Sequence, residues 1–454
     1  MSTDDPCIVV RKWKALSCAL WTKLSKVKCW GICYSGGCGT GDQDTRGDVI
    51  GEMGTNLPFI DLGDFPVVSI SVGLEFACAL SDFGAVKCWG YNSFGQLGQS
   101  DRIYRGSSPG QMGSNLPEID LNGGYVMQLA SGGYHTCVLL EDGGVKCWGF
   151  GYFGALGYGS NYNVGEYGYQ MGRYLAWVDT GEATTSVMSV QSGRGQTCAV
   201  ISNGDVKCWG QNYGVLGYGD TTNRGENANH MGSYLPALDL GYPATLVSIS
   251  VGAYFVCALS ESGRVKCWGA NYAGQLGQGD TTARGESPGQ MGSNLPDVDV
   301  GGGLVVQLSV GSMHTCVLLE DNSVKCWGSG NYGQLGYGSK SSLGTSAEDM
   351  GDNLHVVDVG GTATSSVVAL AGGYYNQCAV LSNGDVKCWG YNEWGVLGLG
   401  DEISRGRGGN TMGSYLPAVD LGEDTTCPVT TTSTTPEPTT TTSTTPEPTT
   451  TTST

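Results

Sequence analysis

The sequence predicts an all-β fold, a seven-bladed β-propeller with four-stranded blades. Three observations lead to this prediction. A phrase like CALSDFGAVKCWG, with two cysteines and a tryptophan, occurs seven times along the 454 residues. Its CWG tripeptides follow one another at intervals of 59 to 62 residues, which indicates a repeat architecture. Each interval holds four short segments rich in small and β-branched residues, and four strands per repeat are typical of a propeller blade.

The second repeat shows the elements of one blade in order. Residues 67–73 (VVSISVG), 76–81 (FACALS) and 85–90 (AVKCWG) predict three strands. A glycine-rich segment follows at 91–106, and NLPEIDL at 115–121 predicts a fourth strand. The predicted organisation is an N-terminal segment at 1–6, the propeller at 7–427 and a stalk at 428–454. The seven repeats span about 7–63, 64–122, 123–182, 183–242, 243–301, 302–361 and 362–427.

The turn between the second and third strands sets the register of each predicted hairpin. Pairing Cys78 with Cys88 leaves a three-residue loop whose last residue, Gly84, suits the positive φ that such loops require. The same position holds Gly143, Gly204, Gly263, Asn322 and Gly384 in five further repeats. Opposed residues of neighbouring strands lie close enough for a disulfide. We therefore predict one disulfide-stapled hairpin per blade, followed by a Trp that wedges between neighbouring blades.

All 18 cysteines have a partner in this arrangement. The predicted hairpin disulfides are Cys18–Cys29, Cys78–Cys88, Cys137–Cys147, Cys198–Cys208, Cys257–Cys267, Cys316–Cys326 and Cys378–Cys388. Cys33 and Cys38 form a local pair, and a Cys7–Cys427 disulfide would close the ring. Full pairing favours an oxidising compartment, so we expect a secreted or cell-surface protein whose signal peptide is not present in this sequence. The alternative is a cytosolic protein with free thiols.

The C-terminal segment 428–454 is composed almost entirely of Thr, Ser and Pro. Such tracts are typical of an O-glycosylated, extended stalk. We therefore predict a disordered, Thr-rich, glycosylated tail, with a plain disordered linker as the alternative.

Charge and composition exclude several function classes. The net charge of −19 disfavours nucleic acid, which requires a basic surface. No apolar run is long enough to cross a membrane, so no direct membrane insertion is expected. Cysteine pairs with metal-ligand spacing are missing and only 4 histidines occur, so no metal site is predicted. Motifs for nucleophilic, phosphate-binding or zinc chemistry are also missing, so we expect no catalytic residue, no cofactor and no enzyme.

Three patterns with possible chemistry are interpreted as structural. His135 and His314 occupy matching positions in two related repeats, and His230 and His355 have no partner motif, so none of the four is assigned a catalytic role. The tripeptide Arg46-Gly47-Asp48 resembles an integrin ligand, but its counterparts read RGS, RGE and RGR. An Asp lies four residues before an Arg in five repeats, which predicts an ion pair that braces the loop, at Asp42/Arg46, Asp101/Arg105, Asp220/Arg224, Asp280/Arg284 and Asp401/Arg405.

The repeat GGYHTCVLLEDGGVKCWGFGYFGALGYGS, with its sister GSMHTCVLLEDNSVKCWGSGNYGQLGYGS, resembles the regulator-of-chromosome-condensation repeat. That family shows a GxxHT…L…DGxVxxWGxNxxGQLG pattern, and the resemblance covers about residues 7–422. It implies a seven-bladed propeller. Family members include a nuclear guanine-nucleotide exchange factor, α-tubulin-suppressor-like proteins and a secreted β-lactamase inhibitor. The exchange-factor role rests on acidic loop residues and a histidine that no local motif places here, so the resemblance implies fold more than function.

These observations predict a non-enzymatic extracellular or cell-surface propeller that binds a protein or glycan through loops on one face. Trp177 and Trp394 are the candidate partner-binding residues, because exposed aromatic side chains favour such contacts; packing between blades is the alternative for both. We expect a monomeric propeller, alone or within a larger chain or assembly. Two rival functions remain, an exchange-factor-like GTPase regulator and a structural module of an extracellular assembly.

Overall fold

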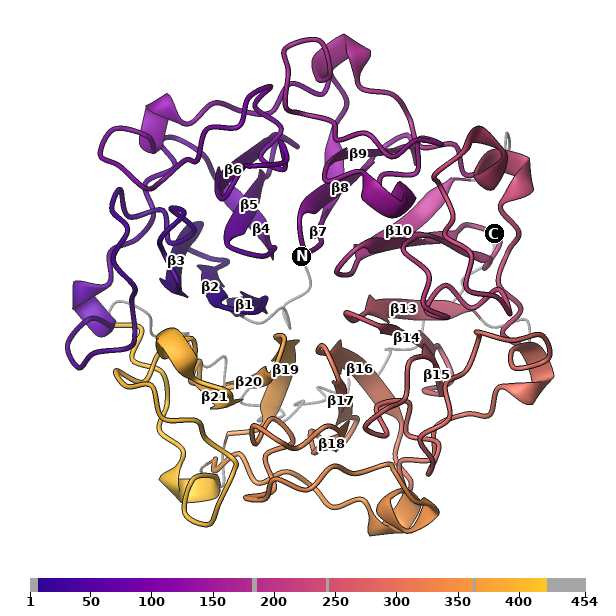
Figure 1. Cartoon of the computed structure of the whole chain (residues 1–454). Helices are drawn as coiled ribbons and strands as arrows, with labels where there is room; N and C mark the ends of the chain where they lie inside the picture. The colour runs from indigo at the N-terminus through magenta and orange to yellow at the C-terminus, as the bar shows by residue number, and fades with distance from the viewer. Residues whose placement is uncertain (1–6, 182–185, 242–244, 362–364, 423–454) are drawn as a thin grey trace, which may run out of the picture.

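The computed structural model describes residues 7–181, 186–241, 245–361 and 365–422. Seven three-stranded antiparallel sheets surround a central opening (Figure 1). The inner strands are β1 (Ile8–Lys12), β4 (Val67–Val72), β7 (Val126–Ser131), β10 (Val187–Ser192), β13 (Leu246–Val251), β16 (Val305–Val310) and β19 (Val367–Gly372). The middle strands are β2 (Leu16–Trp21), β5 (Phe76–Ser81), β8 (His135–Leu140), β11 (Gln196–Ile201), β14 (Phe255–Ser260), β17 (His314–Leu319) and β20 (Asn376–Leu381).

The outer strands complete the blades, and short 3-10 turns lie around the perimeter (Figure 1). The outer strands are β3 (Lys26–Gly31), β6 (Val86–Gly90), β9 (Val145–Gly149), β12 (Val206–Gly210), β15 (Val265–Gly269), β18 (Val324–Gly328) and β21 (Val386–Gly390). The 3-10 turns are η1 (Gly54–Asn56), η2 (Gly113–Asn115), η3 (Tyr152–Gly154), η4 (Gly172–Tyr174), η5 (Ala228–His230), η6 (Gly232–Tyr234), η7 (Gly292–Asn294), η8 (Ala347–Asp349), η9 (Gly351–Asn353), η10 (Glu393–Gly395) and η11 (Gly413–Tyr415).

The predicted all-β, seven-bladed fold is confirmed, and so is the stapled hairpin in every blade. Cys78 lies directly opposite Cys88 in the β5–β6 register, with the two Cα atoms 4.1 Å apart, and the other six hairpins repeat this pairing. The turn residues adopt the positive φ expected of them, 78° at Gly84 and 66° at Asn322. The turn chemistry and the cysteine spacing therefore specify one register together.

Two further disulfides concern the first blade. Cys33 and Cys38 are joined in the structure. Cys7 is disulfide-bonded, but its expected partner Cys427 lies outside the described residues. The same holds for the N-terminal segment 1–6 and the stalk 428–454, so the predictions for these segments stay predictions.

The fourth strand of each blade was predicted wrongly. The NLPEIDL-type segment makes one backbone hydrogen bond to the outer strand, for example from Ile119 N to Val86 O at 2.9 Å, and then leaves it. In the segment of the first repeat, Asp61 O instead accepts a bond from Gly113 N of the next blade at 2.9 Å. The backbone of this segment bonds first to its own blade and then to the next one, so it does not form a continuous strand ladder with either.

The hydrophobic core is divided among the seven interfaces between blades, each of which holds one cluster of buried side chains. The Trp of every CWG tripeptide is fully buried there. Trp89 Nε1 donates to Gly37 O of the preceding blade at 3.0 Å, and Trp148 Nε1 donates to Gln96 O in the same way. The predicted role of this Trp as a wedge between blades is thus seen directly.

The Lys of every VKCWG phrase is also buried at these interfaces, which the sequence analysis did not foresee. Lys146 Nζ donates to Leu121 O of the preceding blade at 2.7 Å, and Lys325 Nζ donates to Val300 O at 2.6 Å. Desolvation by burial lowers the pKa of Lys146. The fourth segment of each blade is not paired as a strand, so some of its backbone carbonyls have no partner strand. The lysine ammonium group carries several N–H donors and can bond to these carbonyls.

The ring closes between the last blade and the first through ordinary blade contacts. Gly54 N donates to Asp420 O at 2.9 Å, and both Trp30 Nε1 and Ser17 Oγ donate to Val396 O, at 3.1 and 2.9 Å. The Gly–Asp bond recurs at every other interface and the Trp bond at most of them, so the seventh interface closely resembles the rest.

Candidate partner-binding face

Seven turns join the inner to the middle strands and surround one end of the central opening. Six of them begin with a glycine: Gly73, Gly132, Gly193, Gly252, Gly311 and Gly373. At Gly193 a Cβ atom would lie 2.5 Å from Gly252 O of the next blade, so only a residue without a side chain fits. Neighbouring turns are also hydrogen-bonded, as between Gly133 N and Gly193 O at 3.0 Å. Similar bonds from Leu74 N to Gly133 O and from Ser312 N to Tyr374 O link further neighbouring turns.

The first blade is the exception, because Trp13 stands where the other blades have glycine. Its side chain is half-buried and borders a cavity of about 50 Å³ together with residues of the fifth, sixth and seventh blades. The Trp13 indole thus occupies part of the space that the six glycines leave open.

Two residues follow this position in each turn, and we call these fourteen residues the rim turns. They are Lys14-Ala15, Leu74-Glu75, Gly133-Tyr134, Arg194-Gly195, Ala253-Tyr254, Ser312-Met313 and Tyr374-Tyr375. They differ from blade to blade, although the residues before and after them recur. The propeller end that carries them is called the rim face.

Six aromatic side chains from the second and third blades form the first aromatic cluster on this face: Tyr91, Phe94, Tyr104, Tyr134, Phe150 and Tyr152. Phe94 contacts Phe150 and Tyr134 with ring centroids 5.0 and 5.3 Å apart. Tyr152 is 54% exposed, and the other five are half-buried. Each ring is therefore held on its edges by neighbours while part of its surface remains accessible.

A second aromatic cluster, made of Tyr332, Tyr374, Tyr375 and Tyr391, lies on the sixth and seventh blades. Tyr332 contacts Tyr391 at 4.8 Å and Tyr375 at 4.9 Å between ring centroids. Desolvation raises the pKa of Tyr375 to about 12 and also raises the pKa of Tyr91 and Tyr134. These hydroxyls are therefore protonated at physiological pH and can donate hydrogen bonds.

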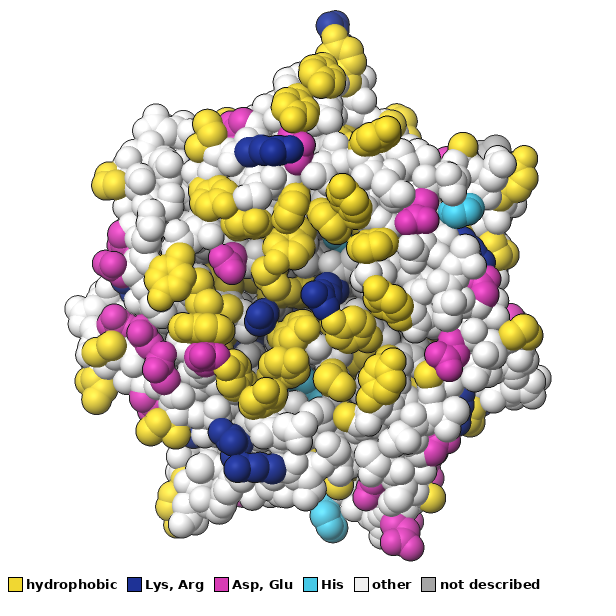
Figure 2. All heavy atoms as spheres, in the orientation of Figure 1, with side chains coloured by type: hydrophobic (Ala, Val, Ile, Leu, Met, Phe, Trp, Pro, Cys, Tyr) yellow, Lys and Arg dark blue, Asp and Glu magenta, His cyan; other side chains and the backbone are white. Residues whose placement is uncertain are grey.

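The two clusters belong to one hollowed surface. Figure 2 shows hydrophobic side chains gathered around the central opening, with Lys and Arg side chains at the opening itself. Arg194 of the fourth blade donates a hydrogen bond to Tyr254 and lies over its ring, 5.6 Å from the centroid. A broad aromatic surface with a basic centre suits recognition of another molecule rather than catalysis.

The two tryptophans proposed from the sequence lie in different surroundings. Trp394 in η10 occupies the position that Phe94 has in the second blade, next to the second aromatic cluster in sequence, and is half-buried. Trp177 is 50% exposed, but its ring covers Lys146 Nζ at 4.5 Å, at the interface between blades. A partner-binding role for either residue stays a prediction.

His135 and His314 are both fully buried, but in the described structure a hydrogen bond is found only for the His135 ring. The Nε2 atom of His135 lies 3.0 Å from Thr197 Oγ1, and desolvation lowers the pKa of His135 to about 4, so it is neutral. The predicted Asp–Arg pairs are present in all five repeats, at 2.6 to 2.7 Å.

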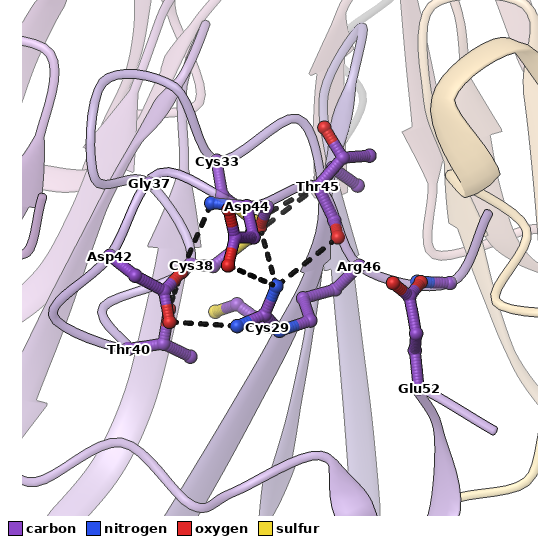
Figure 3. The surroundings of a disulfide bond; sticks show 12 residues. Cys29, Cys33, Gly37, Cys38, Thr40, Asp42, Asp44, Thr45, Arg46 and Glu52 are labelled. Carbon is purple, nitrogen blue, oxygen red and sulfur yellow. Dashed lines mark hydrogen bonds and ion pairs between the residues drawn. A yellow bond between two sulfur atoms is a disulfide. The ribbon is translucent and has the colours of Figure 1, made fainter. Parts of the chain in front are cut away.

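The Arg46-Gly47-Asp48 tripeptide is part of such a loop (Figure 3). Arg46 Nη2 lies 2.7 Å from Asp42 Oδ2, and Gly47 N donates to Glu52 Oε2 at 2.9 Å. The Arg46 side chain is only 17% exposed. The tripeptide therefore does not present a free guanidinium as an adhesion ligand would.

The neighbouring Cys33–Cys38 disulfide replaces a hydrogen bond (Figure 3). The positions of Cys33 and Cys38 correspond to Asn92 and Leu97 in the second blade, where Leu97 N donates to Asn92 Oδ1 at 2.9 Å. The first blade thus secures the same loop covalently.

The sequence analysis missed the rim turns altogether. The signal was available, because two residues vary from repeat to repeat between a recurring glycine and a recurring middle strand. No group of residues suited to a metal ion occurs within the described ranges, and no helix there is long and apolar enough to span a membrane.

The fold defines a seven-bladed propeller, and its rim face carries seven turns and two aromatic clusters. The RCC1-like domain model matches residues 26–426, and the chain belongs to that family. Among curated relatives, the ultraviolet-B receptor UVR8 of Arabidopsis thaliana is 27% identical over 75% of this chain and 68% of its own length. The mitochondrial RCC1 domain-containing protein RUG3 of Arabidopsis thaliana is 27% identical over 71% of this chain and 65% of its own length.

Other relatives are much longer, since a 27% identical match to the human E3 ubiquitin-protein ligase HERC2 covers 84% of this chain but 7% of that protein. Among solved structures, Prp20p from Saccharomyces cerevisiae superposes with a TM-score of 0.61 at 16% identity, over 91% of this chain and 87% of that one. Human WBSCR16 superposes with a TM-score of 0.57 at 19% identity, over 82% and 86% of the two chains. At these identities the likeness establishes the fold alone.

Proposed function

We propose that this protein is a non-enzymatic extracellular or cell-surface propeller that binds a protein or glycan partner through its rim face. The observation that carries the proposal is the pair of aromatic clusters beside the central opening. Rigid tyrosine and phenylalanine rings supply a large contact area and lose little conformational entropy on binding. Their positions on short, hydrogen-bonded turns add to this rigidity.

The disulfides support the extracellular part of the proposal. Every blade contains one disulfide in the hairpin between its middle and outer strands. Stable disulfides in this number are typical of oxidising compartments. The O-glycosylated stalk at 428–454 belongs to the same proposal.

The test is capture of partners from the surface and surroundings of the source cells by the immobilised full chain. A Tyr134→Ser/Tyr375→Ser variant removes one ring from each aromatic cluster. A Tyr234→Ser/Tyr415→Ser variant removes two exposed tyrosines from the 3-10 turns η6 and η11 at the perimeter and serves as the matched control. We expect the rim variant alone to lose the partner. Equal capture by all three proteins would show that the rim face is not the binding surface.

Melting temperatures measured with intact disulfides separate binding from folding. Both variants should unfold within a few degrees of the parent, since the replaced rings are half-buried or exposed. Capture of a small GTPase, with faster nucleotide release in the presence of this protein, would favour the exchange-factor alternative instead.

A further inference from the structure

Positive charge is concentrated around the central opening of the rim face. Lys14 and Arg194 both have exposed side chains in the rim turns, on the first and fourth blades. Arg11 on the inner strand β1 is also exposed, although desolvation lowers its pKa, and its Nη1 donates to Val10 O at 3.1 Å. Figure 2 shows Lys and Arg side chains at the opening, with no acidic side chain between them.

In the described structure these cations share the lack of an ion pair with Arg173 and Arg407, whereas the remaining arginines contact a carboxylate. Seven arginines elsewhere contact a carboxylate: Arg46, Arg102, Arg105, Arg224, Arg264, Arg284 and Arg405. Within the part of the chain that the structure describes, no ion pair involves Arg11, Lys14 or Arg194. The one acidic residue of the rim turns, Glu75, accepts a hydrogen bond from Ser35 Oγ at 2.9 Å. Among the described residues, the central cations are thus without an ion-paired carboxylate.

We propose that the central opening of the rim face binds an acidic segment of a partner protein, whose carboxylates pair with Lys14 and Arg194. The inference rests on the proposed function and specifies its partner. In the bound partner, the residues on either side of these carboxylates contact the two aromatic clusters. Arginine and tyrosine together are the residues that most often dominate protein interfaces, and Arg194 with Tyr254 supplies that combination at the opening.

The overall charge selects a short acidic segment over an extended polyanion. The net charge of −19 repels a ligand that carries negative charge along its whole length, because most of that length would lie over the acidic remainder of the surface. A few carboxylates on an otherwise neutral or basic partner avoid this repulsion. Complementarity of this kind also speeds association and makes it sensitive to salt.

The test uses the full chain and a short fluorescent peptide of Glu and Ala, with a Gln-for-Glu peptide for comparison. The Lys14→Glu/Arg194→Glu variant reverses the two rim cations. The Lys23→Glu/Lys340→Glu variant changes the net charge equally at exposed lysines outside the rim turns. Fluorescence anisotropy should show binding of the Glu peptide that weakens with salt, about tenfold or more weaker binding by the rim variant, and unchanged binding by the control.

Three results would overturn the inference: no binding of the Glu peptide at low salt, equal binding of the Gln peptide, or equal losses in both variants. The proposed function is judged separately by the tyrosine variants. If those variants lose the captured partner while the charge reversal does not, the rim face is the binding surface and the acidic segment is wrong. If neither set of variants affects capture, both proposals are refuted.

Discussion

Lys12 makes a measurable contribution to the pH dependence of stability. It ends β1, is 5% exposed, and its Nζ lies 3.1 Å from Cys378 Sγ and 3.4 Å from Val396 O. No carboxylate is among its hydrogen-bond partners in the described structure. Desolvation lowers its pKa from 10.5 to about 7. The folded state therefore binds this proton more weakly than the unfolded state, so the contribution of Lys12 to stability rises as the pH increases from 7 towards 10.5.

The magnitude follows from these two pKa values. Between pH 7 and pH 9 the unfolded lysine stays mostly protonated while the folded one loses its proton, which changes the free energy of unfolding by about 2 kcal/mol. Lys12→Met removes this titration. The difference in unfolding free energy between the variant and the parent should therefore favour the variant at pH 7 and shrink by about 2 kcal/mol at pH 9.

The assay is equilibrium unfolding in guanidinium chloride at both pH values with disulfides intact. Taking the difference between two proteins cancels the other titrating groups. Lys14→Met serves as control, because Lys14 is exposed and two residues away, and its difference from the parent should stay constant. A Lys12→Met difference that does not change between pH 7 and pH 9 would refute the reasoning.

Three further predictions concern the ring and its disulfides. Gly193→Ala should lower the free energy of unfolding by about 1–3 kcal/mol, because the added Cβ would lie 2.5 Å from a carbonyl oxygen of the next blade. Gly195→Ala is the control and should be tolerated, since its nearest neighbour atom lies at 3.6 Å. Equal melting temperatures of the two variants would contradict this prediction. Cys33→Asn/Cys38→Leu should fold and lose about 2 kcal/mol, because it restores the hydrogen bond of the other blades in place of a short disulfide loop, and failure to fold would show that the loops are not equivalent. Non-reducing peptide mapping of the protein from its native source should find a Cys7–Cys427 peptide besides the hairpin pairs; freely alkylated cysteines would remove the argument for an extracellular location.

The sequence was sufficient for the blade hairpin because two independent constraints coincide there. The spacing from Cys78 to Cys88 and the positive-φ residue Gly84 allow only one register, and that register is observed. The fourth segment was predicted wrongly because alternation of apolar residues reports burial and not the partner of the backbone. Whether Asp61 O bonds to its own blade or to the next depends on contacts between repeats, which a pattern within one repeat does not contain.

The candidate site was harder to predict for a related reason. Tyr134 and Phe150 are far apart in the sequence and meet when the third blade folds, whereas Tyr332 and Tyr391 meet only when the sixth and seventh blades pack against each other. Trp177 attracted attention because it is a large exposed aromatic in a tyrosine-rich stretch, but its ring covers a lysine at a blade interface. For surface aromatic residues, the composition of the surrounding segment was therefore a poorer guide to their role than their position within the repeat.

The position of a residue within the repeat also supports the proposal that the rim face binds the partner. In each blade the Trp and Lys of VKCWG and the Asp of the fourth segment all contact an adjacent blade. The six turn glycines are constrained as well, since a Cβ atom at Gly193 or at any of its counterparts would lie 2.0 to 2.6 Å from a neighbouring atom. Substitution at any of these positions alters an interface that the ring needs in order to close. The exposed residues of the rim turns, such as Lys14 and Arg194, carry no such requirement and differ from blade to blade, so a surface assembled from these turns has no internal symmetry. Such a surface can recognise an asymmetric partner although the scaffold beneath it is a repeat.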